Sequence, residues 1–505
     1  MFVRVRSISI LGLETELVEV EAGISFELPV FVIVGLPDAA IQEARERVRL
    51  AIKNSGFDFP RKKITVNLAP ADWRKEGPAF DLPIAVAVLL TTNQLSMGAD
   101  FSDAVFLGEL ALDGMVRKTS GILPAVIGAK ERGIKRAFVP AENAREAALV
   151  KGIDIYPVKS LYELHAHLSD VSRIKKYENL DTDEVVEANY DHDFSHIRGQ
   201  EHVKRAMEIA AAGMHNILMS GPPGSGKTLI ARTLPSIMPD LSEAEVIEVT
   251  KIYSIAGLLN SEQSLITGRP FRSPHHTSSG VALVGGGRMP RPGEISLAHR
   301  GVLFLDEFPE FPRLVLENLR QPLEDGTVSI SRAQGTLNFP ARFMLVASQN
   351  PCPCGYLTDS EHHCICTPLQ IQKYQRKISG PIIDRIDIHV EVPRVKFEKL
   401  QGPSMAEDSR TVRARVLEAH ERQQWRFRDL PINYNSEMRA VDIENHCVLD
   451  EEGIDLLRQA MKQMHLSARS YHRILKLART IADLSGHDEI HTEHVAEALQ
   501  YRPKI

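Results

Sequence analysis

The chain has 505 residues, of which 43% are hydrophobic and 25% charged, and this length and composition suggest about three folded domains and exclude a disordered polymer. The formal net charge of −6 excludes a globally basic nucleic-acid binder, so any contact with nucleic acid must come from local basic patches. The longest apolar run (83–90) is far too short to span a membrane, and the N-terminus lacks a continuous apolar signal segment. Since only five cysteines are present as well, we expect a cytoplasmic protein without a disulfide scaffold.

The first third of the chain mixes short apolar runs typical of β-strands with stretches of helical periodicity. The predicted strands cover 2–10, 31–34, 63–68, 104–110 and 137–139, and the predicted helices cover 39–55, 81–92 and 121–132. We therefore predict an α+β domain at 1–168. Residues 169–195 are rich in Asp and Glu and lack apolar periodicity, which predicts an exposed acidic linker.

Two segments of this first domain resemble Lon protease, but the residues that peptidase chemistry needs are replaced. The run Lys75–Ala79 is similar to the Lon segment in which a serine follows Gly-Pro, and the serine position is Ala79 here. The run Ser120–Pro124 resembles the segment that carries the catalytic lysine of Lon, and the matching position is Leu123. Ser–Lys chemistry needs both the nucleophile and its base. We predict a Lon-like fold without peptidase activity.

The run GPPGSGKT is the most informative motif of the chain. It follows the apolar segment 217–219 and precedes a helical segment that begins at residue 229, which is the context in which G-x-x-x-x-G-K-[ST] binds phosphates. The glycines let backbone N–H groups point at the anion, and the next helix adds its positive N-terminal dipole. We expect Lys227 to reach the β and γ phosphates of ATP and Thr228 to bind Mg²⁺. The predicted nucleotide-binding loop is Gly221, Pro222, Pro223, Gly224, Ser225, Gly226, Lys227 and Thr228.

Two further apolar runs end in polar side chains that complete the predicted site. The run 302–305 suits a strand buried on both faces of a parallel sheet, and it ends where such sheets place their ligands. We expect Asp306 to bind Mg²⁺ through water and Glu307 to orient and polarise the water that attacks the γ-phosphate. The run 343–348 leads to Asn350, whose amide can position the same water, the role called sensor 1 in AAA+ ATPases. Together these motifs predict a nucleoside triphosphate hydrolase.

Four of the five cysteines lie close together in the order C-x-C, nine residues, C-x-C. They are Cys352, Cys354, Cys364 and Cys366. Four thiolates at this spacing can wrap one tetrahedral metal ion, so we predict a closed structural zinc site. His362 or His363 can replace one thiolate, and disulfides or metal-free packing are the alternatives.

Two stretches of the predicted core favour loops. The chain between Lys227 and Asp306 is longer than one crossover helix and strand require, and the surplus at 269–280 and 285–291 is rich in Gly, Pro, Ser and Arg. The run 327–339 alternates at period two about a turn, which predicts a β-hairpin with a basic residue near its tip.

Three arginines of these stretches are the predicted contacts with nucleic acid. We expect Arg288, Arg291 and Arg332 to line the central channel of a ring and to hold the phosphates of single-stranded or branched DNA. The simpler alternative is that these residues lie on surface loops where each arginine is solvated. From residue 406 onward, apolar residues recur three and four apart, which predicts an all-α lid.

Several motifs of the chain together resemble one family. They are IRGQ at 197–200, the two nucleotide motifs, FRSPHH at 271–276, NPCPCG at 350–355 and LQYRP at 499–503. This combination resembles the YifB/ComM competence-related group of magnesium-chelatase-like AAA+ ATPases, over essentially the whole chain. The resemblance implies an ATP-driven hexameric ring. The best-described members of this family are DNA branch-migration helicases in natural transformation. We add Ile197, from the first of these motifs, to the predicted nucleotide-binding residues.

Two arginines complete the motor by the same resemblance. The run 380–387 is similar to the segment where related motors carry an arginine finger, so Arg385 is expected to reach the γ-phosphate bound by a neighbouring subunit. The run 467–471 resembles the sensor 2 position, so Arg469 is the expected contact within the same subunit, with Arg473 one turn on as its substitute. A structural or surface arginine is the alternative for each.

The sequence thus predicts an α/β multidomain protein. A Lon-like domain (1–168) and an acidic linker (169–195) precede an AAA+ parallel-sheet core (196–392) and a helical lid (393–505). The leading function is ATP-driven DNA translocation or branch migration by a homo-hexamer that makes no membrane contact, with ATP, Mg²⁺ and a structural Zn²⁺ as cofactors. A chelatase-type or remodelling motor whose client is a protein is the alternative, and stimulation of ATP hydrolysis by DNA distinguishes the two.

Overall fold

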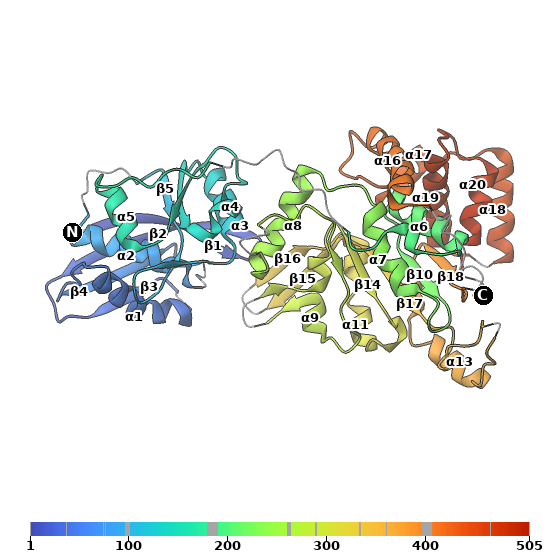
Figure 1. Ribbon diagram of the computed structural model, residues 1–505, viewed down its shortest axis with the longest axis horizontal. Helices are drawn as coiled ribbons and strands as arrows, with labels where there is room; N and C mark the ends of the chain where they lie inside the picture. Colours follow the sequence, from blue (N-terminus) through green and yellow to red (C-terminus); the bar gives the residue numbers. More distant parts are fainter. Residues whose placement is uncertain are drawn as a thin grey trace.

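Three parts of the protein follow one another along its longest axis, from an N-terminal α/β part through a central core to a helical C-terminal part (Figure 1). This computed structural model describes residues 2–36, 38–73, 75, 77–95, 101–178, 190–259, 264–287, 290–332, 335–359, 361–395, 407–464 and 466–503. Within these ranges, no helix combines the length and the apolar character that crossing a membrane requires.

The N-terminal part is built on a four-stranded sheet of order β1-β2-β4-β3, in which β3 is parallel to β4 and the other pairs are antiparallel. Buried residues alternate with less buried ones along β4, because one face of the sheet is covered by helices. Helix α2 packs on β1 and β2 and is buried over its whole length. These elements are β1 Phe2–Leu11, β2 Glu14–Ser25, β3 Phe31–Val34, β4 Lys63–Ala69, α1 Ala39–Asn54 and α2 Asp81–Thr91.

A second, parallel sheet of order β5-β8-β9 completes this part. The single strand predicted at 104–110 is two strands, because β5 pairs with β8 whereas β6 pairs with β7 in a separate ribbon. The elements are β5 Ala104–Phe106, β6 Glu109–Leu110, β7 Val116–Arg117, α3 Ile122–Glu131, β8 Arg136–Pro140, α4 Ala144–Ala147, β9 Asp154–Val158 and α5 Leu161–Leu168.

The central core is a five-stranded parallel sheet of order β11-β14-β17-β10-β18. All four residues of β14 are buried, as the apolar run 302–305 predicted. The strands are β10 Ile217–Ser220, β11 Phe271–Arg272, β14 Val302–Leu305, β17 Met344–Gln349 and β18 Ile388–Glu391, and the first helices are α6 Glu201–Gly213, α7 Lys227–Ile237 and α8 Glu243–Ala256. Because the strands are parallel, the segments that follow β10, β14 and β17 meet at one edge. The predicted fold class is confirmed.

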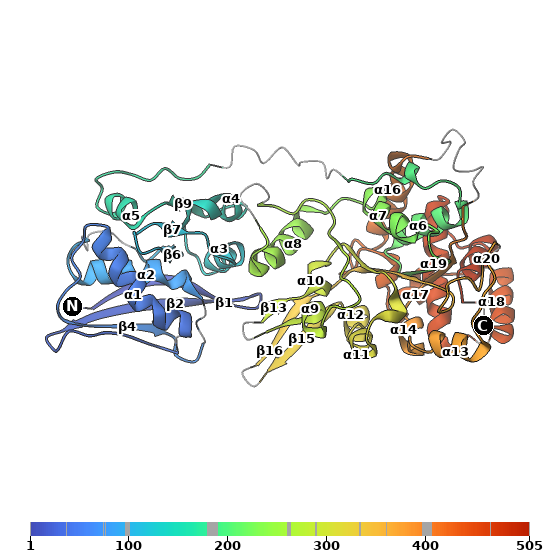
Figure 2. The ribbon, with the colours of Figure 1, turned by 60° about the horizontal axis from the view of Figure 1, so that its bottom comes forward.

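Two β-hairpins project from this core beside the N-terminal part (Figure 2). The hairpin predicted at 327–339 is β15 Thr327–Arg332 with β16 Gly335–Pro340, and a shorter one is β12 Gly285–Gly286 with β13 Arg291–Pro292. The two are in contact, since a Cβ on Gly285 would lie 3.2 Å from Cδ1 of Ile330. The short helices of this region are α9 Gly280–Val284, α10 Glu294–Leu297, α11 Arg313–Glu317, α12 Arg320–Asp325, α13 Pro368–Gln375 and α14 Gly380–Ile383.

The C-terminal part is helical, as its periodicity predicted. Helices α16 and α19 pack on α6, and one hydrophobic cluster runs from β10, β17 and β18 into these helices. Helix α19 begins after Ser467, whose side chain accepts the backbone N–H of Ser470. The helices are α16 Ser409–Arg426, α17 Ala440–His446, α18 Glu451–Gln463, α19 Ala468–Leu484 and α20 Thr492–Gln500.

The acidic linker predicted at 169–195 is anchored at both of its described ends. Ile174 is buried in the N-terminal core, and Phe194 is buried in the cluster that the sheet shares with the lid. The backbone N–H of Phe194 also donates to Oγ of Ser409 at 2.7 Å. The prediction that the linker is exposed is therefore wrong at these two apolar residues, because each is buried in the core of the part that it joins. Residues 179–189 lie outside the described ranges.

The N-terminal part meets the central core at helix α8, beside α3 and α4 (Figure 1). The backbone N–H of Gly121 donates to the carbonyl oxygen of Ser254 at 3.0 Å. Oγ of Ser254 donates to the buried carboxyl group of Glu146. At a second point, a Cβ on Gly12, in the turn between β1 and β2, would lie 3.3 Å from Cδ2 of Leu337 in β16. The two parts are thus joined by polar and apolar contacts.

Candidate functional site

The glycine-rich loop lies between β10 and α7, and its lysine is held in place by the loop itself. Gly221 has to be glycine because a Cβ there would lie 2.1 Å from the carbonyl oxygen of Val392. Nζ of Lys227 donates to the carbonyl oxygens of Gly221 and Pro222 at 2.7 and 2.8 Å, and it lies 3.4 Å from Oδ1 of Asn350. Burial lowers the pKa of the Lys227 ammonium. The predicted phosphate ligand and the predicted sensor amide therefore lie side by side.

The two predicted magnesium ligands also meet. Oγ1 of Thr228 donates to Oδ2 of Asp306 at 2.9 Å, and the buried Oγ of Ser348 donates to Oδ1 of the same carboxylate. A hydroxyl oxygen beside a carboxylate suits Mg²⁺, which takes oxygen ligands. Ser348 is a positioning residue that the sequence analysis did not identify. Its signal was present, since it is the polar side chain that ends the buried part of a predicted strand.

Glu307, the second residue after β14, has an unusual backbone conformation. Its φ of 52° lies in the left-handed region, which is unusual for a residue other than glycine and re-aims the side chain. The side chain of Glu307 is 55% exposed, and its Oε2 lies 3.1 Å from Nδ1 of His276. His276 belongs to the FRSPHH motif, which lies in the loop predicted at 269–280.

The IRGQ motif supports the pocket through its last residue. The side chain of Ile197 is buried in the same hydrophobic cluster as Phe194, so it contributes to the packing of the core. Nε2 of Gln200 donates to the carbonyl oxygens of Ser225 and Pro393, at 3.1 and 2.6 Å. Gln200 therefore fixes the glycine-rich loop against the segment after β18. The sequence analysis missed this role, because nothing local shows that the two segments converge.

The two predicted motor arginines share one carboxylate. Nη2 of Arg385 donates to Oε1 of Glu324, and Nη2 of Arg469 lies 3.9 Å from the same oxygen. In the parts of the chain that the structure describes, neither arginine forms a hydrogen bond or ion pair with the loop 221–228. They therefore lie close to the same carboxylate, where Arg385 is buried and Arg469 is exposed. Arg469 is expected to contact the nucleotide of its own subunit and Arg385 that of a neighbouring subunit. For both contacts to form, at least one of the two arginines has to leave Glu324.

Arg473, the substitute for Arg469, has a different role in the structure. Its Nη1 donates to Oδ1 of Asp387 at 2.8 Å, and the carboxylate of Asp387 is buried where the core sheet meets the lid. The backbone N–H of Asn216 donates to the other oxygen of this carboxylate at 3.1 Å. Arg473 therefore connects lid helix α19 to the core beside β10 and β18.

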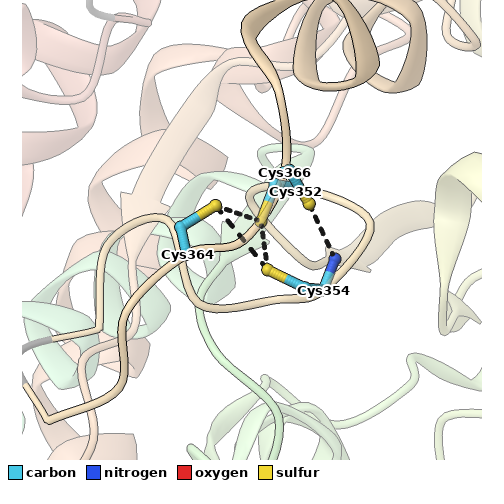
Figure 3. Close-up of side chains that lie close together, drawn as sticks. All are labelled: Cys352, Cys354, Cys364 and Cys366. Atoms are coloured by element: carbon cyan, nitrogen blue, oxygen red, sulfur yellow. Dashed lines mark hydrogen bonds between the residues drawn. The ribbon is translucent and has the colours of Figure 1, made fainter.

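The four clustered cysteines converge on one point (Figure 3). Sγ of Cys352 lies 3.4 Å from that of Cys354 and 3.7 Å from that of Cys364, and the last two are 3.6 Å apart. Sγ of Cys366 accepts the backbone N–H of Cys354, and all four sulfur atoms lie within 4.8 Å of one another. Sulfur atoms around a tetrahedral zinc ion, with bonds of about 2.3 Å, are separated by about 3.8 Å. The site fits zinc, and all five cysteines are free thiols rather than disulfides.

The cysteine loop is in contact with the nucleotide loop. A Cβ on Gly355, whose φ is 86°, would lie 2.6 Å from Cδ of Pro223. The same Cβ would lie 3.8 Å from Cγ of Asn350, which precedes the first cysteine pair. The order of the cysteine loop and the geometry of the phosphate-binding loop are therefore linked directly.

Two of the predicted DNA-binding arginines belong to the two hairpins. Arg291 is exposed and lies in β13. Arg332 ends β15, the strand that leads to the tip of the longer hairpin. Arg288 lies outside the described residues.

Comparisons with known proteins identify the family. A family model described as magnesium chelatase, subunit ChlI, matches residues 193–400, and models for subunit ChlI of Mg-chelatase and for the ChlI C-terminal region match 20–143 and 406–502. Competence protein ComM of Haemophilus influenzae is 42% identical over 500 residues, which are 98% of this chain and 96% of that protein. YifB of Salmonella typhimurium is 42% identical over 493 residues, 97% of this chain and 95% of that protein. The chain belongs to the ComM/YifB family of magnesium-chelatase-like AAA+ ATPases.

Membership of the ComM/YifB family confirms the resemblance found in the sequence, and it implies ATP and Mg²⁺ as the ligands of the pocket. The chain is also 26% identical over 152 residues to Lon protease 1 of Hydrogenovibrio crunogenus, which is 28% of this chain and 18% of that protein. Leu123, which the sequence resemblance matches to the catalytic lysine of Lon, is fully buried, and its backbone N–H donates to Glu146 at 2.9 Å. This position presents an apolar side chain to the core and offers no base.

Proposed function

We propose that this ComM/YifB-family protein is an ATP-driven ring motor that acts on single-stranded or branched DNA, as a branch-migration helicase or translocase. The observation that carries the proposal is that one segment of the core, between β11 and α10, reaches both the nucleotide pocket and the predicted DNA-binding hairpin. His276 of this segment contacts Glu307 of the pocket, and Arg291 of the same segment lies in β13 of the hairpin. The name of the relative ComM, a competence protein, supports DNA as the client.

The pocket residues divide the hydrolysis of ATP among them. Lys227 exchanges its carbonyl partners for the β and γ phosphates. Thr228 and Asp306 would hold Mg²⁺, which would neutralise charge on the phosphates. Glu307 accepts a proton from the attacking water as the water oxygen bonds to the γ-phosphorus and the bond to the ADP oxygen breaks. Asn350 orients this water from the end of β17. Arg385, from a neighbouring subunit, stabilises the charge that develops on transfer, so we propose a homo-hexamer.

Removing the hairpin arginines tests the DNA client. The triple variant Arg288→Ala, Arg291→Ala, Arg332→Ala is expected to bind DNA more weakly at every sequence. Its salt dependence should be shallower by roughly one unit of slope per lost phosphate contact. Hydrolysis without DNA should persist, because these residues lie outside the pocket. Binding is measured by fluorescence anisotropy over a salt series, together with stimulation of hydrolysis by DNA.

A control triple variant separates local contact from net charge. Arg49, Arg173 and Arg458 are exposed and lie on α1, after α5 and on α18, and their replacement by Ala changes the net charge equally. The control should keep the affinity and salt slope of the wild-type protein. Equal losses in both triple variants would point to a general charge effect and remove the hairpins from the DNA site. A wild-type protein that no DNA stimulates would favour a protein client.

We also propose that Cys352, Cys354, Cys364 and Cys366 hold one structural Zn²⁺. The purified protein is expected to carry close to one zinc per chain, and the double variant Cys352→Ser, Cys364→Ser should lose it. Since binding of a structural metal contributes directly to folding, the melting temperature of the double variant should fall even without nucleotide. Cys447→Ser is the control, because Cys447 is a buried thiol outside the cluster. Four freely reactive thiols and no zinc by elemental analysis would exclude the site.

A further inference from the structure

Asn216 is the residue directly before β10, the strand that leads into the glycine-rich loop. Its carbonyl oxygen accepts the backbone N–H groups of Asp387 and Ile388, each at 3.0 Å. Its own backbone N–H donates to Oδ2 of Asp387 at 3.1 Å. Both backbone groups of Asn216 are therefore fixed to the chain that enters β18.

The side-chain amide of Asn216 joins two further segments. Its Nδ2 donates to the carbonyl oxygen of Arg385 at 3.1 Å, and its Oδ1 accepts the backbone N–H of Leu345 in β17 at 2.8 Å. A carbonyl oxygen can only accept and a backbone N–H can only donate, so the two partners fix which end of the amide faces which segment. An aspartate carboxylate would lack the donor, and an apolar side chain would lack both groups.

The segments that Asn216 joins serve two different nucleotide pockets. β10 and β17 end at the pocket of this subunit, where they lead to the glycine-rich loop and to Asn350. Arg385 precedes β18, at the opposite edge of the parallel sheet, and is proposed to reach the pocket of a neighbour. β10 has four residues, so at about 3.3 Å per residue the two edges are roughly 13 Å apart. Asn216 thus lies where a shift of the pocket strands reaches the arginine.

The residues beside Asn216 hold the lid instead. Oδ1 of Asp387 accepts Nη1 of Arg473 from lid helix α19 at 2.8 Å. Nε2 of the buried His215 lies 2.8 Å from Oγ1 of Thr480 in the same helix. Asn216 differs from these neighbours, because its side chain joins segments of the core to one another and makes neither of these lid contacts.

The backbone of Arg385 depends on this anchor. Its N–H donates to the carbonyl oxygen of Ile382 in α14 at 2.9 Å, within the same short helical turn. Its carbonyl oxygen, by contrast, is bonded to another part of the core through Asn216. When the guanidinium exchanges Glu324 for the phosphate of a neighbour, this hydrogen bond would remain as a link between the arginine and the sheet.

We propose that Asn216 is a positioning residue that couples the nucleotide pocket of one subunit to the pocket of the next. Its amide sets the position of Arg385 relative to β10 and β17, so a movement of these strands on ATP binding or hydrolysis moves the arginine that serves the neighbour. The proposal rests on the action of Arg385 in trans under the proposed function, and it adds the route by which successive pockets influence one another. Cooperative hydrolysis of ATP is the consequence.

Asn216→Ala in the full-length protein gives the first test. Its Kd for a fluorescent ATP analogue is expected to stay the same, because Lys227 and Thr228 are untouched. Its turnover number is expected to fall roughly 10- to 100-fold, the loss that follows when a catalytic group is misplaced by about 1 Å. The Hill coefficient of hydrolysis against ATP concentration should fall toward one, whereas that of the wild-type protein lies above one.

Asn67→Ala is the matched control. Nδ2 of Asn67 donates to Oε2 of Glu21 at 2.9 Å, so this asparagine also joins two segments, but in the sheet of the N-terminal part. The affinity for the ATP analogue, the turnover number and the Hill coefficient should all match those of the wild-type protein.

Mixed rings separate a defect in supplying the arginine from a defect in the subunit's own pocket. Lys227→Ala subunits have an intact Arg385, so mixing them with Asn216→Ala subunits should restore part of the activity, as mixing with Arg385→Ala subunits does. A general structural defect of Asn216→Ala would stay within its own pocket and would give no recovery. Activity is measured over a series of mixing ratios at constant total protein, and ring assembly is followed by native mass spectrometry.

Asn216→Asp guards against a folding defect of the alanine variant. It keeps the acceptor for Leu345 and removes only the donor to Arg385, so it should show the same loss of turnover and the same recovery in mixed rings. Recovery with Arg385→Ala but with neither variant of Asn216 overturns the role of Asn216 and leaves the ring motor standing.

The Hill coefficients decide the coupling. A coefficient of one for the wild-type protein, or an unchanged coefficient in both variants of Asn216, overturns it. If Arg385→Ala itself shows no recovery in mixed rings, the action of Arg385 in trans is wrong and the role of Asn216 falls with it. Stimulation of hydrolysis by DNA still decides the client in that case.

Discussion

Replacing Glu307 by Gln is expected to reduce the turnover number of ATP hydrolysis by about 100-fold or more, the usual contribution of a general base. Binding of ATP should be kept, because the lysine, the threonine hydroxyl and the carboxylate of Asp306 all remain. An amide of the same shape can still touch the water but cannot take its proton. The turnover number is measured with a coupled assay, and binding is measured with a fluorescent ATP analogue.

Lys227→Ala is the contrasting variant and should weaken ATP binding itself. Lys227 is buried and donates to the carbonyl oxygens of the loop, so it is held where the loop is expected to bind phosphate. The two variants thus divide binding from chemistry. Hydrolysis by Glu307→Gln at a near wild-type rate would mean that another group activates the water, and the assignment of the end of β14 would be wrong.

Replacing Arg385 by Ala is expected to lower ATP hydrolysis by on the order of 10³-fold, since an arginine supplied by a neighbour stabilises the transferring phosphoryl group. Mixing Arg385→Ala subunits with Lys227→Ala subunits should restore part of the activity. An intact loop in one subunit then meets an intact arginine from the next. Activity of the wild-type protein should also rise with protein concentration as rings assemble.

Glu324→Gln is the control for this experiment. It removes the ion pair between Arg385 and Glu324 but keeps the guanidinium, which still donates to the carbonyl oxygen of Pro381. We expect this variant to stay active and to assemble normally. If Glu324→Gln were as inactive as Arg385→Ala, and mixing restored nothing, the Arg385–Glu324 pair would be a structural element of its own subunit. The position of Arg469 at the same carboxylate makes it a second residue to examine in mixed rings.

The motifs predicted most of the pocket, because its functional residues lie just after the ends of strands. The segments after β10, β14 and β17 each carry a short pattern that specifies a loop or a polar end, and a parallel sheet brings these ends together. Strand β2 was missed although its glutamates alternate with apolar residues, which is the pattern typical of a strand with one buried face. In the structure it pairs with β1 on one side and with β4 on the other.

The remaining parts of the site depend on contacts between distant segments. Gln200 lies 25 residues from Ser225, and Ser348 lies 42 residues from Asp306, so only the folded chain reveals these hydrogen bonds. His276 was visible in a motif, but its partner was not. The sequence alone also could not decide which of Arg385 and Arg469 acts in cis and which in trans, because this depends on where the lid lies relative to Glu324.

The attachment of the N-terminal part to α8 gives the front of the molecule a mechanical role. Tyr253, beside Ser254 on α8, donates its hydroxyl to the carbonyl oxygen of Leu297 in α10. Glu146 of the N-terminal part accepts a hydrogen bond from Ser254 of the same helix. Helix α8 is therefore in contact both with the N-terminal part and with α10, so a movement of this helix during the ATP cycle would reach both. A fluorophore on the N-terminal part would report such a movement as an optical signal.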